Sequence, residues 1–135
     1  MTIEDVEREL EFTFPLPHRR DIENADDRIH IACEYLLPDG PGRQDFLEAN
    51  RYLRKESWQG WEKPYVAFAS QGCGDWFAYD TSIIPYKIFY VDPTERVKDA
   101  AAKSGEGTLV LATYEAWKEC TLQTYDEGSE DFDGW

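Results

Sequence analysis

Apolar residues recur at helical spacing at the start of the chain. Ile3, Val6 and Leu10 lie three or four positions apart, with polar residues between them. This pattern predicts an amphipathic helix over residues 3–11. The two prolines within residues 14–17 predict a turn that ends this helix, because proline lacks a backbone donor and biases the residue before it towards extended geometry.

The segment 28–37 fits two different periods. Ile29, Ile31 and Cys33 alternate as in a strand, whereas Ile29, Cys33 and Leu36 also fall on one face of a helix. We favour the strand for this segment, and the helix is the alternative.

Turn-forming residues fill positions 38–42 and precede a second helical pattern. Phe46, Ala49 and Leu53 share one face in the polar sequence that follows. The spacing predicts a helix over residues 43–56.

From residue 64 onwards the chain becomes rich in β-branched and aromatic residues, with later segments of this kind at 75–80 and 86–92. The connections at 71–74 and 81–85 are short. Parallel neighbours need a crossover of about a dozen residues or more, so short connections predict an antiparallel meander.

The last third of the sequence predicts a short alanine-rich helix after residue 93, a possible strand over 109–112 and a final helix capped by Thr113. Residues 125–135 contain five acids and no base, which is the composition of a flexible acidic tail. We therefore expect a single domain over residues 1–124 followed by a tail.

Composition adds a strong acidic bias. The 135 residues carry 28 acids against 14 Lys and Arg, a net charge of −14, and the 41% of hydrophobic residues suffices for a core. Such a field repels nucleic acid and anionic membranes and favours basic partners, although solubility alone is the alternative explanation. An odd number of scattered cysteines, with no signal peptide and no apolar run of membrane-spanning length, predicts a cytoplasmic protein with free thiols.

The sequence FASQGCGDWFAYD, residues 68–80, is the most distinctive stretch for candidate chemistry. Cys73 lies next to Asp75, whose charge opposes thiolate formation, and the chain offers only His18 and His30 as bases. The scattered cysteines and histidines lack the spacing of a zinc site, and we expect no metal and no cofactor. The glycines instead predict a tight turn between two strands, with a binding rim as a further possibility.

The same stretch resembles the central signature of the SUKH superfamily, bacterial immunity proteins related to a fungal cell-wall synthesis regulator. The resemblance is carried by Phe68-Ala69-x-x-Gly72-x-Gly74-Asp75-Trp76-x-x-Tyr79-Asp80, then by Pro85-Tyr86-x-Ile88-Phe89-Tyr90-Val91-Asp92, and more loosely by Leu16-Pro17 and by Thr113-Tyr114-Glu115-Ala116-Trp117. It spans most of residues 3–122. Residues 18–25 depart from the family pattern because they lack its apolar spacing.

The resemblance implies an α+β fold with a mostly antiparallel, twisted sheet, helices packed mainly on one side, and no catalysis. It also implies a protein that binds and neutralises a cognate toxin, often a nuclease, by stoichiometric association. A regulatory or scaffold adaptor that recruits a basic partner through residues 125–135 is the alternative, and a small hydrolase using Cys73 or an acid is a weaker one.

Binding to a basic protein would depend on buried aromatic anchors more than on charges at the rim. The candidates for partner binding are Trp58, Trp61, Asp75, Trp76, Tyr79 and Asp80. For each aromatic residue the alternative role is core packing, and for Asp75 it is a structural role in the turn.

Overall fold

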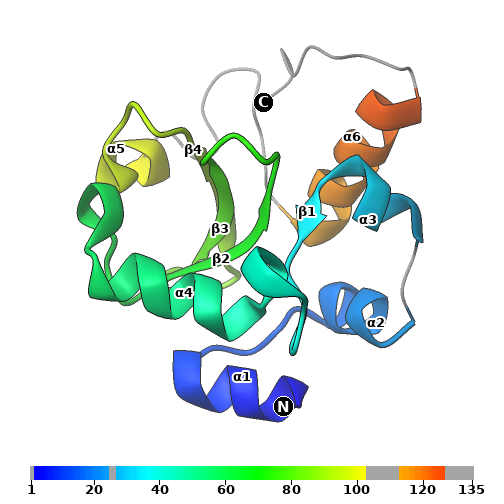
Figure 1. Cartoon of the computed structure of the whole chain (residues 1–135), viewed down its shortest axis with the longest axis horizontal. Coiled ribbons are helices and arrows are strands. Elements are labelled where there is room, and N and C mark those ends of the chain that lie inside the picture. The colour runs from blue at the N-terminus through cyan, green and yellow to red at the C-terminus, as the bar shows by residue number, and fades with distance from the viewer. Residues whose placement is uncertain (1, 25–26, 103–112, 127–135) are drawn as a thin grey trace.

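The computed structural model describes residues 2–24, 27–102 and 113–126 as helices, strands and their connections (Figure 1). The elements, in chain order, are α1 (Ile3–Leu10), α2 (Leu16–Asn24), α3 (Asp27–Ala32), β1 (Glu34–Tyr35), the 3-10 helix η1 (Gly42–Gln44), α4 (Phe46–Lys55), the 3-10 helix η2 (Trp58–Gly60), β2 (Tyr65–Ser70), β3 (Trp76–Asp80), β4 (Lys87–Val91), α5 (Val97–Ala102) and α6 (Tyr114–Asp126). The fold of this part of the chain is α+β.

The four strands form one antiparallel sheet in the order β1-β2-β3-β4. Ala67 of β2 pairs with Ala78 of β3, which pairs in turn with Phe89 of β4. The meander predicted for residues 64–92 is therefore confirmed, and its two connections lie where the sequence placed them.

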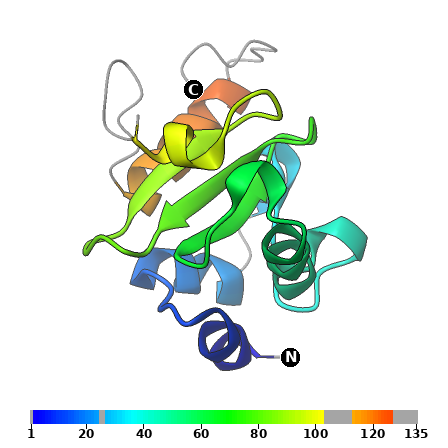
Figure 2. The same cartoon turned by 90° about the vertical axis from the view of Figure 1, so that its left-hand side faces the viewer.

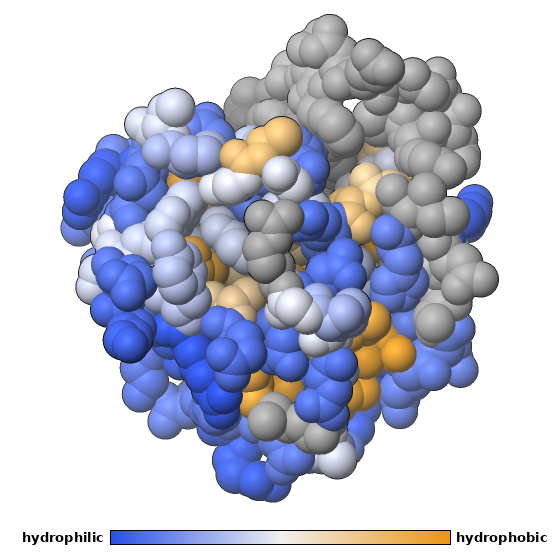
Figure 3. Space-filling view, viewed as in Figure 1, coloured by the Kyte–Doolittle hydropathy of each residue, from blue (hydrophilic) through white to orange (hydrophobic). Residues whose placement is uncertain are grey.

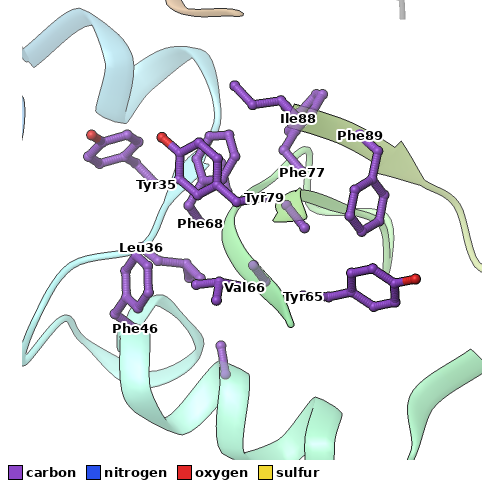
Figure 4. Close-up of a cluster of buried hydrophobic side chains, with 14 of the residues drawn as sticks. Tyr35, Leu36, Phe46, Tyr65, Val66, Phe68, Phe77, Tyr79, Ile88 and Phe89 are labelled. Carbon is purple, nitrogen blue, oxygen red and sulfur yellow. The ribbon is translucent and has the colours of Figure 1, made fainter. Parts of the chain in front are cut away.

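Both faces of the sheet are covered. Figure 4 shows Phe68 and Tyr79 on one side of the strands and Tyr65 with Phe89 on the other. The first side packs against α2 and α6, whereas α5 lies on the second (Figures 1 and 2). One face of the sheet thus carries α2 and α6, and the other carries the short helix α5. β2 is buried at all six positions, with Ser70 as its only polar residue, so it needs cover on both faces.

The edge of β2 is completed by a side chain. β1 pairs only through Glu34 and Tyr35, and beyond it the amide of Asn50, from α4, takes the place of a neighbouring strand. Its Nδ2 donates to the carbonyl of Ala67 at 2.9 Å, and its Oδ1 accepts from the Ala67 N–H at 2.8 Å. Asn50 is fully buried, so these bonds satisfy backbone groups that water cannot reach.

The N-terminal third contains one helix that the sequence did not predict. The helix predicted over 3–11 is confirmed as α1, but the prolines that were expected to form only a turn lead directly into α2. Pro17 occupies the first turn of α2, where a missing backbone donor costs nothing. The polar sequence of α2 hides its role, since the residue that it buries is His18.

The segment 28–37 combines both of the alternatives considered for it. Residues up to Ala32 belong to α3, so the strand favoured there is wrong, and only Glu34 and Tyr35 form a strand. Ile29 and Cys33 are buried four positions apart, and the Cys33 thiol donates to the Ile29 carbonyl. The helical face that was the alternative is the one that packs.

The remaining predicted helices are confirmed with shifted ends. The helix expected over 43–56 begins at Phe46, capped by the Asp45 side chain, because residues 42–44 form η1 instead. Thr113 caps α6 through a bond from the Ala116 N–H, and α6 continues to Asp126. The strand expected over 109–112 and the rest of the expected tail lie outside the described residues. In the part of the chain that the structure describes, no helix has the length and apolar character to cross a membrane.

Candidate functional site

A hollow of about 580 Å³ opens between α4, η2 and the turn that joins β2 to β3. Its described lining consists of Gly42, Glu48, Ala49, Tyr52, Trp58, Gly74 and Trp76, and we call it the aromatic hollow. Trp58 and Trp76 are half-buried, and Tyr52 is 55% exposed. Large aromatic side chains that remain accessible in a hollow are the groups that most often carry binding energy between proteins.

Tyr52 lies on the outer side of α4. The buried face of this helix packs into the core through Phe46 and Leu53, and Tyr52 lies outside that face and is left facing solvent. Glu48 lies one helical turn before Tyr52 and lines the same hollow. Sequence reasoning missed Tyr52, although an aromatic residue outside the apolar face of α4 was visible in the pattern.

Trp58 is held by a loop with unusual backbone geometry. Ser57, Gln59 and Gly60 have φ values of 48°, 50° and 82°, in the left-handed region. Such conformations are costly for residues other than glycine and persist where the surroundings impose them. Here the Gln59 Nε2 donates to the carbonyls of Pro93 and Glu95 at 2.9 and 2.8 Å, which ties the loop to the segment before α5.

Trp76 follows the glycine turn, whose role as a turn is confirmed. Gly72 and Gly74 have φ values of 90° and 77°, which the missing side chain permits. Asp75 is fully buried, and its Oδ1 accepts from the Ser70 hydroxyl and from the Gln71 and Cys73 N–H groups at 3.0 to 3.2 Å. Asp75 therefore shapes the turn beside the aromatic hollow from a buried position, which is the structural role given as its alternative.

Three other predicted site residues also lie outside the aromatic hollow. Trp61 and Tyr79 are 4% and 1% exposed and belong to the core, where Trp61 donates to the Tyr65 carbonyl at 3.1 Å. Asp80 lies at the other end of β3 and accepts from the Ser82 N–H and hydroxyl. Of the six candidates, Trp58 and Trp76 are the two that line the aromatic hollow. The burial of Trp61 and Tyr79 was not predicted, because a sequence does not show which aromatic residues are covered by other segments.

The pairing needed for a cysteine nucleophile is not formed by His18. Cys73 is exposed in the turn, whereas His18 is buried and its Nδ1 lies 2.8 Å from the Tyr79 hydroxyl. His30 contacts the ring of Tyr35. Among the described residues no group of three or more His, Cys, Asp or Glu side chains is placed to hold a metal ion.

His18 lies among aromatic rings, stacked on Tyr114 with their centroids 4.4 Å apart and edge-on to Phe14 and Phe68. Burial lowers the pKa of His18 from 6.5 to about 3. In the unfolded chain the imidazole takes up a proton first as the pH falls. The folded protein therefore has its full stability with respect to His18 above pH 6.5. Its free energy of unfolding falls progressively as the pH is lowered from 6.5 towards 3.

We expect the free energy of unfolding to fall by about 2 kcal/mol between pH 6.5 and pH 5 through this group. Urea unfolding of the protein and of His18→Phe at several pH values measures it, and the variant should lose this part of the slope. His30→Asn, which leaves His18 in place, is the matched control. Equal slopes in the protein and His18→Phe would contradict the assignment.

A second, larger hollow of about 890 Å³ is bordered by α2 and α6. Its lining carries three cations, Arg20, Arg28 and Lys118, and three acids, Asp21, Glu115 and Glu119. Asp21 accepts from the Tyr114 hydroxyl at 2.7 Å and from the Lys118 ammonium at 3.0 Å. The charges that line this hollow are of both signs, and Lys118 pairs with Asp21 within it. This hollow is therefore less suited to select a basic partner than the aromatic hollow is.

Comparison with models of known protein families, with curated proteins and with solved structures found no match to this chain. The resemblance to the SUKH superfamily therefore stays a prediction from residues 68–92 and their surroundings.

Proposed function

We propose that this chain is a non-catalytic binding protein, similar to SUKH immunity proteins, that neutralises a cognate toxin with a basic surface by stoichiometric association in the cytoplasm. The observation that carries the proposal is the aromatic hollow, which leaves Tyr52, Trp58 and Trp76 accessible on a chain of net charge −14. Aromatic anchors supply affinity at an interface, and long-range charge supplies speed and selectivity of encounter.

The charge has a specific consequence for the class of partner. A nuclease that grips phosphates presents Lys and Arg, and an acidic protein is attracted to that surface and can cover it. The face seen in Figure 3 is mostly hydrophilic, with hydrophobic side chains in small patches. A surface of this kind suits a protein that stays soluble alone and engages its partner through one limited anchor region.

Binding should depend on the two tryptophans of the aromatic hollow. With a toxin encoded beside this gene, Trp58→Ala and Trp76→Ala should each weaken the complex at least tenfold, as expected for aromatic anchors. Ile84→Ala is the matched control, since Ile84 is 87% exposed in the turn between β3 and β4. Calorimetric titration of the purified proteins, together with survival of toxin-expressing cells, measures the effect.

Two results would contradict the proposal. The absence of any complex, together with no protection of toxin-expressing cells, would contradict the proposed function. Equal losses of binding affinity in Ile84→Ala and Trp58→Ala would show that the aromatic hollow is not the binding site. An adaptor that recruits its partner through the acidic end should instead lose binding when residues 127–135 are deleted, a truncation that leaves α6 complete.

A further inference from the structure

The aromatic hollow combines aromatic rings with a carboxylate. Of its described lining residues only Glu48 is charged, and the three largest are Tyr52, Trp58 and Trp76. The faces of tyrosine and tryptophan rings carry negative charge density and attract cations. A ring-lined hollow with an acid at its edge is therefore suited to a positively charged group.

Glu48 can accept a further donor. Its Oε1 lies 2.9 Å from the Arg51 guanidinium, but Arg51 is held more closely by Glu9, at 2.5 and 2.6 Å through two nitrogens. Arg51 therefore sits between two acids, and the cluster of Glu9, Glu48 and Arg51 keeps a net negative charge. The Glu48 side chain is 67% exposed, so an incoming donor can reach it.

We propose that the aromatic hollow receives an arginine side chain of a basic protein partner, with the guanidinium against the rings and donating to Glu48. This inference rests on the proposed function, since it names the group on the toxin that the aromatic hollow recognises. The negative edge of the aromatic hollow, on a chain of net charge −14, is complementary to the positive charge of an arginine side chain.

Arginine fits this environment better than lysine or an apolar side chain does. Its planar guanidinium stacks on rings, is weakly hydrated and has several donors in a fixed plane, whereas the ammonium of lysine holds its water strongly. An apolar side chain would remove water from the edge of the aromatic hollow without giving Glu48 a partner. Arginine therefore uses the rings and the carboxylate together at a lower cost in lost hydration than lysine does.

Two peptides of equal charge test the inference without a known partner. The octapeptides (Gly-Arg)4 and (Gly-Lys)4 experience the same general attraction to the acidic chain, so the ratio of their dissociation constants isolates what the guanidinium gains over the ammonium. We expect (Gly-Arg)4 to bind about two- to fivefold more tightly, the range for a cation on partly exposed rings. In NMR titrations the indole N–H signals of Trp58 and Trp76 should move, and those of buried Trp61 and Trp117 should not.

Variants decide the origin of this preference. Trp58→Ala should reduce the difference between the two peptides, and Glu48→Gln should weaken (Gly-Arg)4 binding more than Glu56→Gln, which removes an exposed acid outside the aromatic hollow. Equal binding of both peptides to the unmodified protein, or an undiminished preference in Trp58→Ala, would overturn the inference. If the peptides bound equally but a toxin complex still formed through the tryptophans, the proposed function would stand and the recognition of arginine would fall. A preference for arginine without any toxin complex would support the recognition of arginine and contradict the proposed function.

Discussion

Replacing Asn50 with alanine should lower the free energy of unfolding by about 2 to 6 kcal/mol. The substitution leaves both the N–H and the carbonyl of Ala67 without partners in the interior, and each such group costs about 1 to 3 kcal/mol. The bond from Asn50 to the Phe46 carbonyl is lost as well. Chemical denaturation followed by circular dichroism measures the change, provided that the denaturant dependence is unaltered.

Asn24→Ala is a close control for this measurement. Asn24 also donates to the carbonyl four residues before it, that of Arg20, but it is exposed and bonds to no strand. Its replacement should cost no more than about 0.5 kcal/mol. If both variants lost the same stability, the bonds to β2 would not be what makes Asn50 important.

The second large effect is expected at Asp75. Asp75→Ala removes the acceptor shared by the Ser70 hydroxyl and by two N–H groups of the turn, and should cost about 2 to 4 kcal/mol because these bonds end on a buried carboxylate. Loss of the turn should also disturb the neighbouring Trp76. Thermal and urea unfolding measure the loss of stability, and the indole N–H signal of Trp76 in NMR spectra serves as the local probe.

Asp80→Ala provides the comparison on the same strand. Its carboxylate is accessible to solvent and bonds only locally, to Ser82, so we expect a loss below about 1 kcal/mol. A similar cost for Asp75→Ala and Asp80→Ala would mean that Asp75 does not organise the turn. A loss of toxin binding in Asp80→Ala at unchanged stability would restore this residue as a contact.

The elements that follow a strict period could be predicted from sequence. The face of Phe46, Ala49 and Leu53 gave the central part of α4, and short connections gave the meander. α2 was missed because its polar face dominates and its buried residue is a histidine, whose burial depends on rings from distant segments. Packing between segments that are distant in the sequence does not produce a periodic pattern of apolar residues within α2.

The candidate site was predicted only in part for a similar reason. Trp58 and Trp76 were chosen for size and aromatic character, and these properties are equally those of Trp61 and Tyr79, which pack inside. The path of the chain distinguishes Trp58 from Trp61, because Trp58 precedes the bend at Gly60 and Trp61 follows it. A positive φ at Gln59 cannot be foreseen from its residue type.

The amide of Asn50 has a consequence beyond the stability of one molecule. Strand edges with free backbone groups act as templates for the strands of other chains and so promote aggregation. At Ala67 of β2 both groups are already occupied from α4. This single side chain thus closes a stretch of sheet edge to intermolecular strand addition, while requiring no additional strand in a chain of 135 residues.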